Sequence, residues 1–183
     1  GEHFGAENMN TLIAYHNNAQ IKADILAQLQ RHFDADELVK GRYWEGGKGC
    51  AVGCTIYSGN HMEYQPRFGI PAAIARLEDR IFEGLPNDEA KLWPLRLMAA
   101  IQPGQDLSRV GWWFLHWLLT DATINPGIAH PLVKDAVAQC ADVVCNLAKG
   151  NPLDASATWS AASAAWSAQS AASAASAEWS AQS

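Results

Sequence analysis

Apolar side chains recur every three to four positions along most of the chain, a spacing that places them on one side of a helix. Between Asn18 and Phe33 this pattern brings Ile21, Ile25 and Leu29 onto one face. The polar residues that follow run to Gly41, which we expect to stop the helix. No stretch alternates strictly over five or more residues, so the sequence predicts an all-α fold, or nearly so, built as an irregular multi-helix bundle.

Further helices are expected where residues typical of helix ends flank the same spacing of apolar side chains. Pro71 suits a first helical position, and the apolar face that follows runs to Gly84. Asn87 is expected to cap the next helix, which Pro94 should kink or restart. The segment 110–119 is apolar all round, which is typical of a central helix buried by its neighbours. A last helix of this body is expected over 131–149.

The C-terminal segment, residues 155–183, follows an approximate seven-residue repeat of Trp, Ser and Ala that predicts one long helix. At 100° per residue, a smooth face is formed by Ala157, Ala161, Ala164 and Ala168. The candidate contact residues on the other sides are Trp159, Trp166 and Trp179. We therefore divide the chain into a helical globular domain, 1–150, and a C-terminal helix, 151–183, that packs either on this domain or on a partner.

Charge and composition narrow the function classes. Thirteen basic residues are scattered among 19 acidic ones, with a formal net charge of -6, so we expect no nucleic-acid partner. The longest apolar run is too short to span a bilayer, and the helical tail carries no Lys or Arg for a membrane surface. The first ten residues lack the apolar run of a signal peptide. Four cysteines indicate reduced thiols, and we expect a cytoplasmic protein.

The densest unusual segment, residues 41–61, contains six glycines. Its sequence Gly47-Lys48-Gly49 just before a helix start would present backbone N–H groups and an ammonium to an anion. A nucleotide-binding P-loop does not fit, because the first glycine of that motif is missing and Gly49 stands where Ser or Thr is required. With Trp44 beside them, these three residues form a candidate site for a small anion or other ligand.

Cys50 follows this glycine-rich turn, and the periodicity of 50–57 does not decide between strand and helix. At a helix N-terminus next to a lysine, the pKa of its thiol would be lowered, which favours a nucleophilic thiolate with His61 as candidate base. The alternative is a buried structural turn. Cys140 and Cys145 do not complete a zinc knuckle with the first cysteine pair, so we assign no metal, and the cofactor question stays open.

A charged face is expected on the helix that follows Pro71. Acids and bases alternate along it, which is typical of a solvated ion-pair surface. The residues are Arg76, Glu78, Asp79, Arg80 and Glu83.

Short motifs in the first two thirds of the chain resemble a family of bacterial proteins without an established activity. The resemblance covers about residues 15–119, and Ala/Trp/Ser tails are similar to those of other bacterial proteins. It implies a bacterial origin and no catalytic residue. The motifs are Gly47–Thr55, Gly69–Pro71, Leu77–Asp79 and Ile81–Pro86.

Two hypotheses follow. The first is a non-enzymatic cytoplasmic interaction protein whose helical body and repeat helix contact another protein chain, of its own kind or another. The second is a Cys-dependent enzyme, or a small-anion or ligand-binding protein, centred on the loop Gly46–Cys54.

Overall fold

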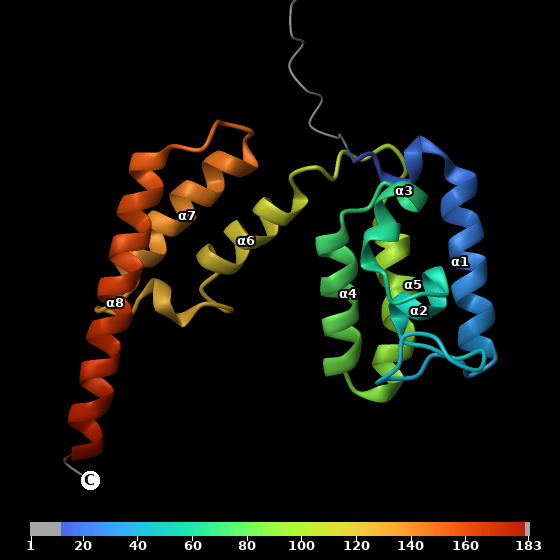
Figure 1. Cartoon of the computed structure of the whole chain (residues 1–183), viewed down its shortest axis with the longest axis horizontal. Helices are drawn as coiled ribbons and strands as arrows, with labels where there is room; N and C mark the ends of the chain where they lie inside the picture. The colour runs from blue at the N-terminus through green and yellow to red at the C-terminus, as the bar shows by residue number, and fades with distance from the viewer. Residues whose placement is uncertain (1–11, 182–183) are drawn as a thin grey trace, which may run out of the picture. The chain divides into compact units, whose positions relative to one another are not determined.

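The computed structural model describes residues 12–181, with side chains described through residue 171 and at 173. Within this range the all-α prediction is confirmed: there is no β-strand, and short 3₁₀ turns connect the helices. The prediction that the first ten residues are not a signal peptide concerns a segment outside the described residues. The helices (Figure 1) are α1 (Ala19–Asp34), α2 (Ala51–Ile56), α3 (Tyr64–Phe68), α4 (Ala72–Gly84), α5 (Asn87–Ala100), α6 (Val110–Thr120), α7 (Lys134–Ala148) and α8 (Ala155–Ala181).

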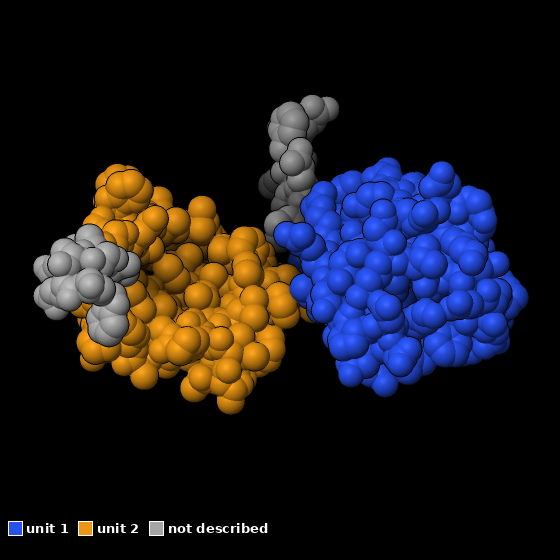
Figure 2. All heavy atoms as spheres, turned by 90° about the horizontal axis from the view of Figure 1, so that it is seen from below, with its two compact units in different colours: residues 1–108 blue, residues 109–183 orange. Residues whose placement is uncertain are grey.

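The chain divides into two compact units at a different place from the predicted boundary at 150–151. Unit 1 comprises residues 1–108 and unit 2 residues 109–183 (Figure 2). The difference arises because α6 and α7 pack on each other, and α8 packs on α7. The sequence pattern had assigned α6 and α7 to the same body as α1–α5.

Unit 1 is a layered cluster in which α5 packs against both α1 and α4, and α2 packs against α1 and α4. Asn18 caps α1, because its side chain accepts the N–H of Gln20. The helix ends at Asp34 and not near Gly41, since Asp36 takes a left-handed backbone conformation with φ 55°. Large side chains that are fully buried in this core include Tyr15, Leu29, Tyr64, Phe82 and Met98.

Helix α5 begins at Asn87, after an extended Pro86, so Asn87 is its first residue and not its cap. The helix continues through Pro94 as a single element, and the proline is buried. Of the two predicted effects of Pro94, a kink or the start of a new helix, the second therefore does not occur.

Unit 2 is an open layer in which α7 lies between α6 and α8 (Figure 1). The described residues show no substantial packing of α6 on α8. Helix α6 consequently has no buried residue, although its sequence predicted a central buried helix. That prediction was wrong, because within this unit α6 lies at an edge of the layer and only one of its sides contacts α7.

Helix α8 packs on α7 with the smooth face that the repeat predicts. Ala161 and Ala168 are buried, and Ala157 and Ala164 are half-buried. Because these side chains are small, α8 can approach α7 closely. The tail therefore does pack within its own chain, and between residues 155 and 171 its two buried side chains belong to the alanine face.

Candidate functional site

The glycine-rich segment forms a tight hairpin-like loop that docks against α2. Glu45 and Lys48 exchange backbone hydrogen bonds of 2.8 and 3.1 Å across Gly46 and Gly47. Both glycines have positive φ angles, 59° and 81°, as a two-residue type I′ turn requires. The two glycines are thus explained by the turn itself.

The loop leaves few backbone donors for an anion. The N–H of Lys48 donates to Glu45, that of Gly49 to Glu37, and that of Cys50 to Arg42. An anion-binding loop instead needs such N–H groups to point at the ligand. These bonds argue against the predicted anion cradle at Gly47–Gly49.

Two other glycines are required by close backbone packing. A Cβ atom at Gly49 would lie 2.0 Å from the carbonyl oxygen of Tyr43, and one at Gly53 would lie 1.3 Å from the same oxygen. Any side chain at either position would force the loop away from α2. This part of the motif therefore serves the docking of the loop.

Cys50 caps helix α2, and its sulfur accepts the N–H of Gly53 at 3.5 Å. The residue is only 1% exposed. Burial raises the pKa of the thiol to about 12, and the neighbouring Asp79 carboxylate acts in the same direction. The predicted lowering of this pKa was wrong, because loss of hydration outweighs the favourable cap and Lys48 remains exposed.

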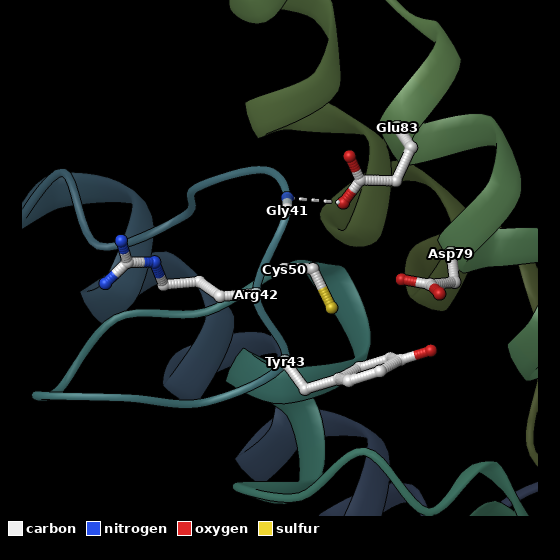
Figure 3. A pocket seen from close by; sticks show the side chains of 6 residues that line it. All are labelled: Gly41, Arg42, Tyr43, Cys50, Asp79 and Glu83. Atoms are coloured by element: carbon white, nitrogen blue, oxygen red, sulfur yellow. Dashed lines mark hydrogen bonds between the residues drawn. The ribbon is translucent and has the colours of Figure 1, made fainter.

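Cys50 lies at an open pocket of about 250 Å³ between the loop and α4. Figure 3 shows Tyr43 and Cys50 pointing toward Asp79, with Glu83 above them and Arg42 turned away. Glu83 accepts the N–H of Gly41 at 3.0 Å and so ties the loop to α4. Asp79 and Glu83, which were predicted to lie on a solvated face of α4, therefore line a pocket.

Asp79 also brings the second candidate catalytic residue into this region. His61 Nε2 lies 3.6 Å from Asp79 Oδ2, and the His61 ring meets the Tyr43 ring edge to face at 5.7 Å. The Asp79 carboxylate also raises the pKa of Tyr43. The structure therefore gathers Cys50 and His61 around one carboxylate, an arrangement that the sequence pattern did not indicate because Asp79 is remote along the chain.

The remaining ligand-binding candidates lie elsewhere. Trp44 packs edge to face with Tyr57 at 4.8 Å and with His32 at 5.5 Å, in a cluster of rings. Lys48 borders a different pocket, together with Lys91 of α5 and other residues. The structure does not bring Trp44 or Lys48 to the pocket of Cys50.

The prediction of a solvated charged face on α4 fails most clearly at Glu78. Its side chain is fully buried, and Oε2 accepts the hydroxyl of Tyr64 at 2.7 Å, while Oε1 has no partner among the described residues. Burial raises the pKa of this carboxyl to about 8, and the Asp79 charge adds to the effect, against the Tyr64 hydrogen bond. The signal was present in the sequence, since Glu78 lies on the same helical stripe as Ala75 and Phe82.

The four cysteines are free thiols, two buried in unit 1 (Cys50 and Cys54) and two partly exposed in unit 2 (Cys140 and Cys145). Cys54 donates to the carbonyl of Gly49 at 3.4 Å, and burial raises the pKa of its thiol to about 12. In the part of the chain that is described, no three His, Cys, Asp or Glu side chains are placed to hold a metal ion.

Unit 2 exposes an unusual amount of aromatic surface. On α8, Trp159 and Trp166 are 75% and 73% exposed. On α6, the three tryptophans Trp112, Trp113 and Trp117 are each between 41% and 45% exposed. The Trp179 side chain lies outside the described part. The larger apolar patches of a monomeric protein are often contact sites, whereas single exposed apolar residues are ordinary.

No family model, curated protein or solved structure matches this chain, so the resemblance based on the loop motifs stays a prediction. Among residues 12–181, none of the helices combines the length and the apolar character needed to cross a bilayer.

Proposed function

We propose that the chain is a non-enzymatic, cytoplasmic interaction protein that binds a protein partner through the exposed tryptophans of unit 2. The observation that carries this proposal is the exposure of five tryptophan side chains on α6 and α8. We call these residues the tryptophan surface: Trp112, Trp113, Trp117, Trp159 and Trp166.

Tryptophan is enriched at the energetically dominant positions of protein interfaces, because its large ring loses much apolar area when it is covered. A nucleic acid is disfavoured as the partner by the acidic net charge of the chain. An anionic membrane is disfavoured because Glu178 is the sole charged residue of the repeat helix. A protein surface is the partner that fits both properties.

The alternative, a Cys-dependent enzyme, draws support from the approach of Cys50 and His61 to Asp79. Its chemistry is opposed by the burial of the thiol. A thiol with a pKa of about 12 is ionised in about one molecule in 10⁵ at pH 7. The carboxylate next to Cys50 is, moreover, a charge that disfavours the thiolate and not one that stabilises it.

Site-specific photo-crosslinking in the native host tests the proposal. A photoreactive amino acid is placed at Trp113 or Trp159, and in control chains at the exposed polar positions Arg76 of α4 and Gln139 of α7. We expect covalent protein adducts from the two tryptophan positions and none from the controls. Absence of protein adducts at both tryptophan positions, in a chain of unchanged helix content, would refute the proposed function.

A further inference from the structure

The layer of unit 2 ends in two tryptophan-bearing edges that do not meet each other. Helix α6 forms one edge and α8 the other, with α7 packed between them. On α6, Trp113 and Trp117 are separated by four residues and so share a side of the helix. On α8, Trp159 and Trp166 are separated by seven residues and also share a side.

The exposed edge of α8 lies opposite its packed face. Relative to the buried Ala161, Trp159 and Trp166 are rotated by about 160° and 140° around the helix axis. Between them lie the small exposed residues Ala162 and Ser163, which allow another helix to approach. The α7 contact therefore leaves this edge available.

We infer that a second copy of this chain covers both edges, with the α8 edge of each copy packed on the α6 edge of the other. This inference rests on the proposed function and names its partner. The arrangement has two-fold symmetry, so the contact between α6 and α8 occurs twice in the dimer. Each copy covers the exposed edges of the other.

The exposed area fits such a dimer. At about 250 Å² for each tryptophan side chain, the four tryptophans of the two edges expose roughly 600 Å² per copy, or about 1,200 Å² for two copies. Stable interfaces bury about 1,200–2,000 Å² in total. Pairing of α8 with α8 alone would cover only about 740 Å² of tryptophan surface, which falls below that range. Both edges are needed.

Charge does not oppose this pairing. Between residues 155 and 171, α8 carries no charged side chain, whereas at the α6 edge the Asp121 carboxylate accepts the indole N–H of Trp117 at 3.0 Å. Two copies therefore bring no like charges together at these edges, although the net charge of each chain is -6.

Sedimentation equilibrium and light scattering on the full-length chain test the inference with two double variants. W113S/W117S removes the α6 edge and W159S/W166S removes the α8 edge. Serine and tryptophan have similar helix propensities, so the helices are expected to persist, and circular dichroism checks this. M62S, which removes a 50% exposed side chain from unit 1, is the matched control.

The wild-type chain and M62S are expected to be dimers, and each double variant alone a monomer. Mixing the two double variants is the decisive step. In the mixed pair, only one contact has both of its edges intact, and it covers about half of the wild-type area. A weak heterodimer should therefore appear only at high protein concentration, where neither variant alone associates.

Three results would overturn the inference: a wild-type chain that is monomeric at about 100 µM, a W113S/W117S variant that dimerises as strongly as the wild-type chain, or a mixture that associates no more strongly than either variant alone at the highest concentration reached. A monomer that binds vesicles of anionic phospholipid through the tryptophans would also overturn it. If the chain is monomeric but photo-crosslinks to a different protein at Trp113 or Trp159, the second copy is wrong and the interaction function stands. If neither self-association nor adducts are found, both fail.

Discussion

Replacement of the buried Glu78 by glutamine should remove a specific part of the pH dependence of unit 1 stability. The carboxyl group is fully buried in the core and receives a hydrogen bond from Tyr64. Glutamine has nearly the same shape and keeps an oxygen for that bond. It places an NH₂ group where Oε1 has no partner, which costs about 1–3 kcal/mol at every pH.

The magnitude of the pH effect follows from the two pKa values. The pKa of Glu78 is about 8 in the folded chain, against an ordinary value of 4.5 when unfolded. Below pH 4.5 both states are protonated and the group adds no pH dependence. Between the two values the unfolded chain releases the proton and the folded chain keeps it, so stability falls as pH rises, by about 1.4 kcal/mol per unit. From pH 5 to pH 8 the loss is about 3–4 kcal/mol.

Amide hydrogen exchange of α4 peptides, followed by mass spectrometry and corrected for the intrinsic exchange rate at each pH, measures this effect within unit 1. The difference in opening free energy between the wild-type chain and E78Q should change by about 3–4 kcal/mol from pH 5 to pH 8, in favour of E78Q at the higher pH. Titrating groups that do not interact with Glu78 are common to both chains and cancel in this difference. Parallel curves for the two chains would refute the reasoning.

Three further outcomes follow from burial. Thiol reagents should modify Cys50 at least about 100-fold more slowly in the native chain than in urea, whereas the partly exposed thiols of unit 2 react at once; rapid native labelling of Cys50 would revive the enzymatic alternative. Gly53→Ala should destabilise unit 1 by about 3 kcal/mol or more, because its Cβ would overlap a backbone oxygen, while Gly84→Ala, with open space around its Cβ, should be tolerated in thermal unfolding. Ala161→Leu should loosen α8 from α7 by about 1–3 kcal/mol and speed proteolysis of the tail, with Ser160→Leu, exposed and away from both the alanine face and the tryptophan edge, as the control; equal proteolysis of the two would mean that the alanine face is not the packed one.

Local signals in the sequence predicted most of the helices of this fold. The apolar periodicity of residues 18–33 is that of α1, the proline-framed segment ending at Gly84 is α4, and the seven-residue repeat has the alanine face that packs. Each of these depends on residues within a few turns of one another. Periodicity and capping act over that range, so the pattern suffices.

The site depended on contacts that local pattern does not contain. Asp79 meets Cys50 and His61 only because the loop docks on α4, and no spacing along the chain encodes that docking. Glu78 required a choice between two stripes of one helix, and its charge favoured the solvent side although its position favoured the core. The apolar sequence of α6 predicts that another surface covers this helix. Only the structure shows that the rest of unit 2 does not bury it.

The two faces of α8 differ in how strongly they can hold the helix, and this has a measurable consequence. Ala161 and Ala168 remove little apolar area from water, about 0.8 kcal/mol for each methyl group, and an Ala/Ser helix is marginal without packing. Cover over Trp159 and Trp166 would add a larger apolar contribution to the same helix. Its helicity should therefore rise with protein concentration, seen as stronger ellipticity at 222 nm between about 0.5 and 50 µM. W159S/W166S should show no such rise, because it has no edge for a second copy to cover. If the wild-type chain dimerises over this range with unchanged ellipticity, α8 is held by its alanine face alone, and the tryptophans serve contact without stabilising the helix.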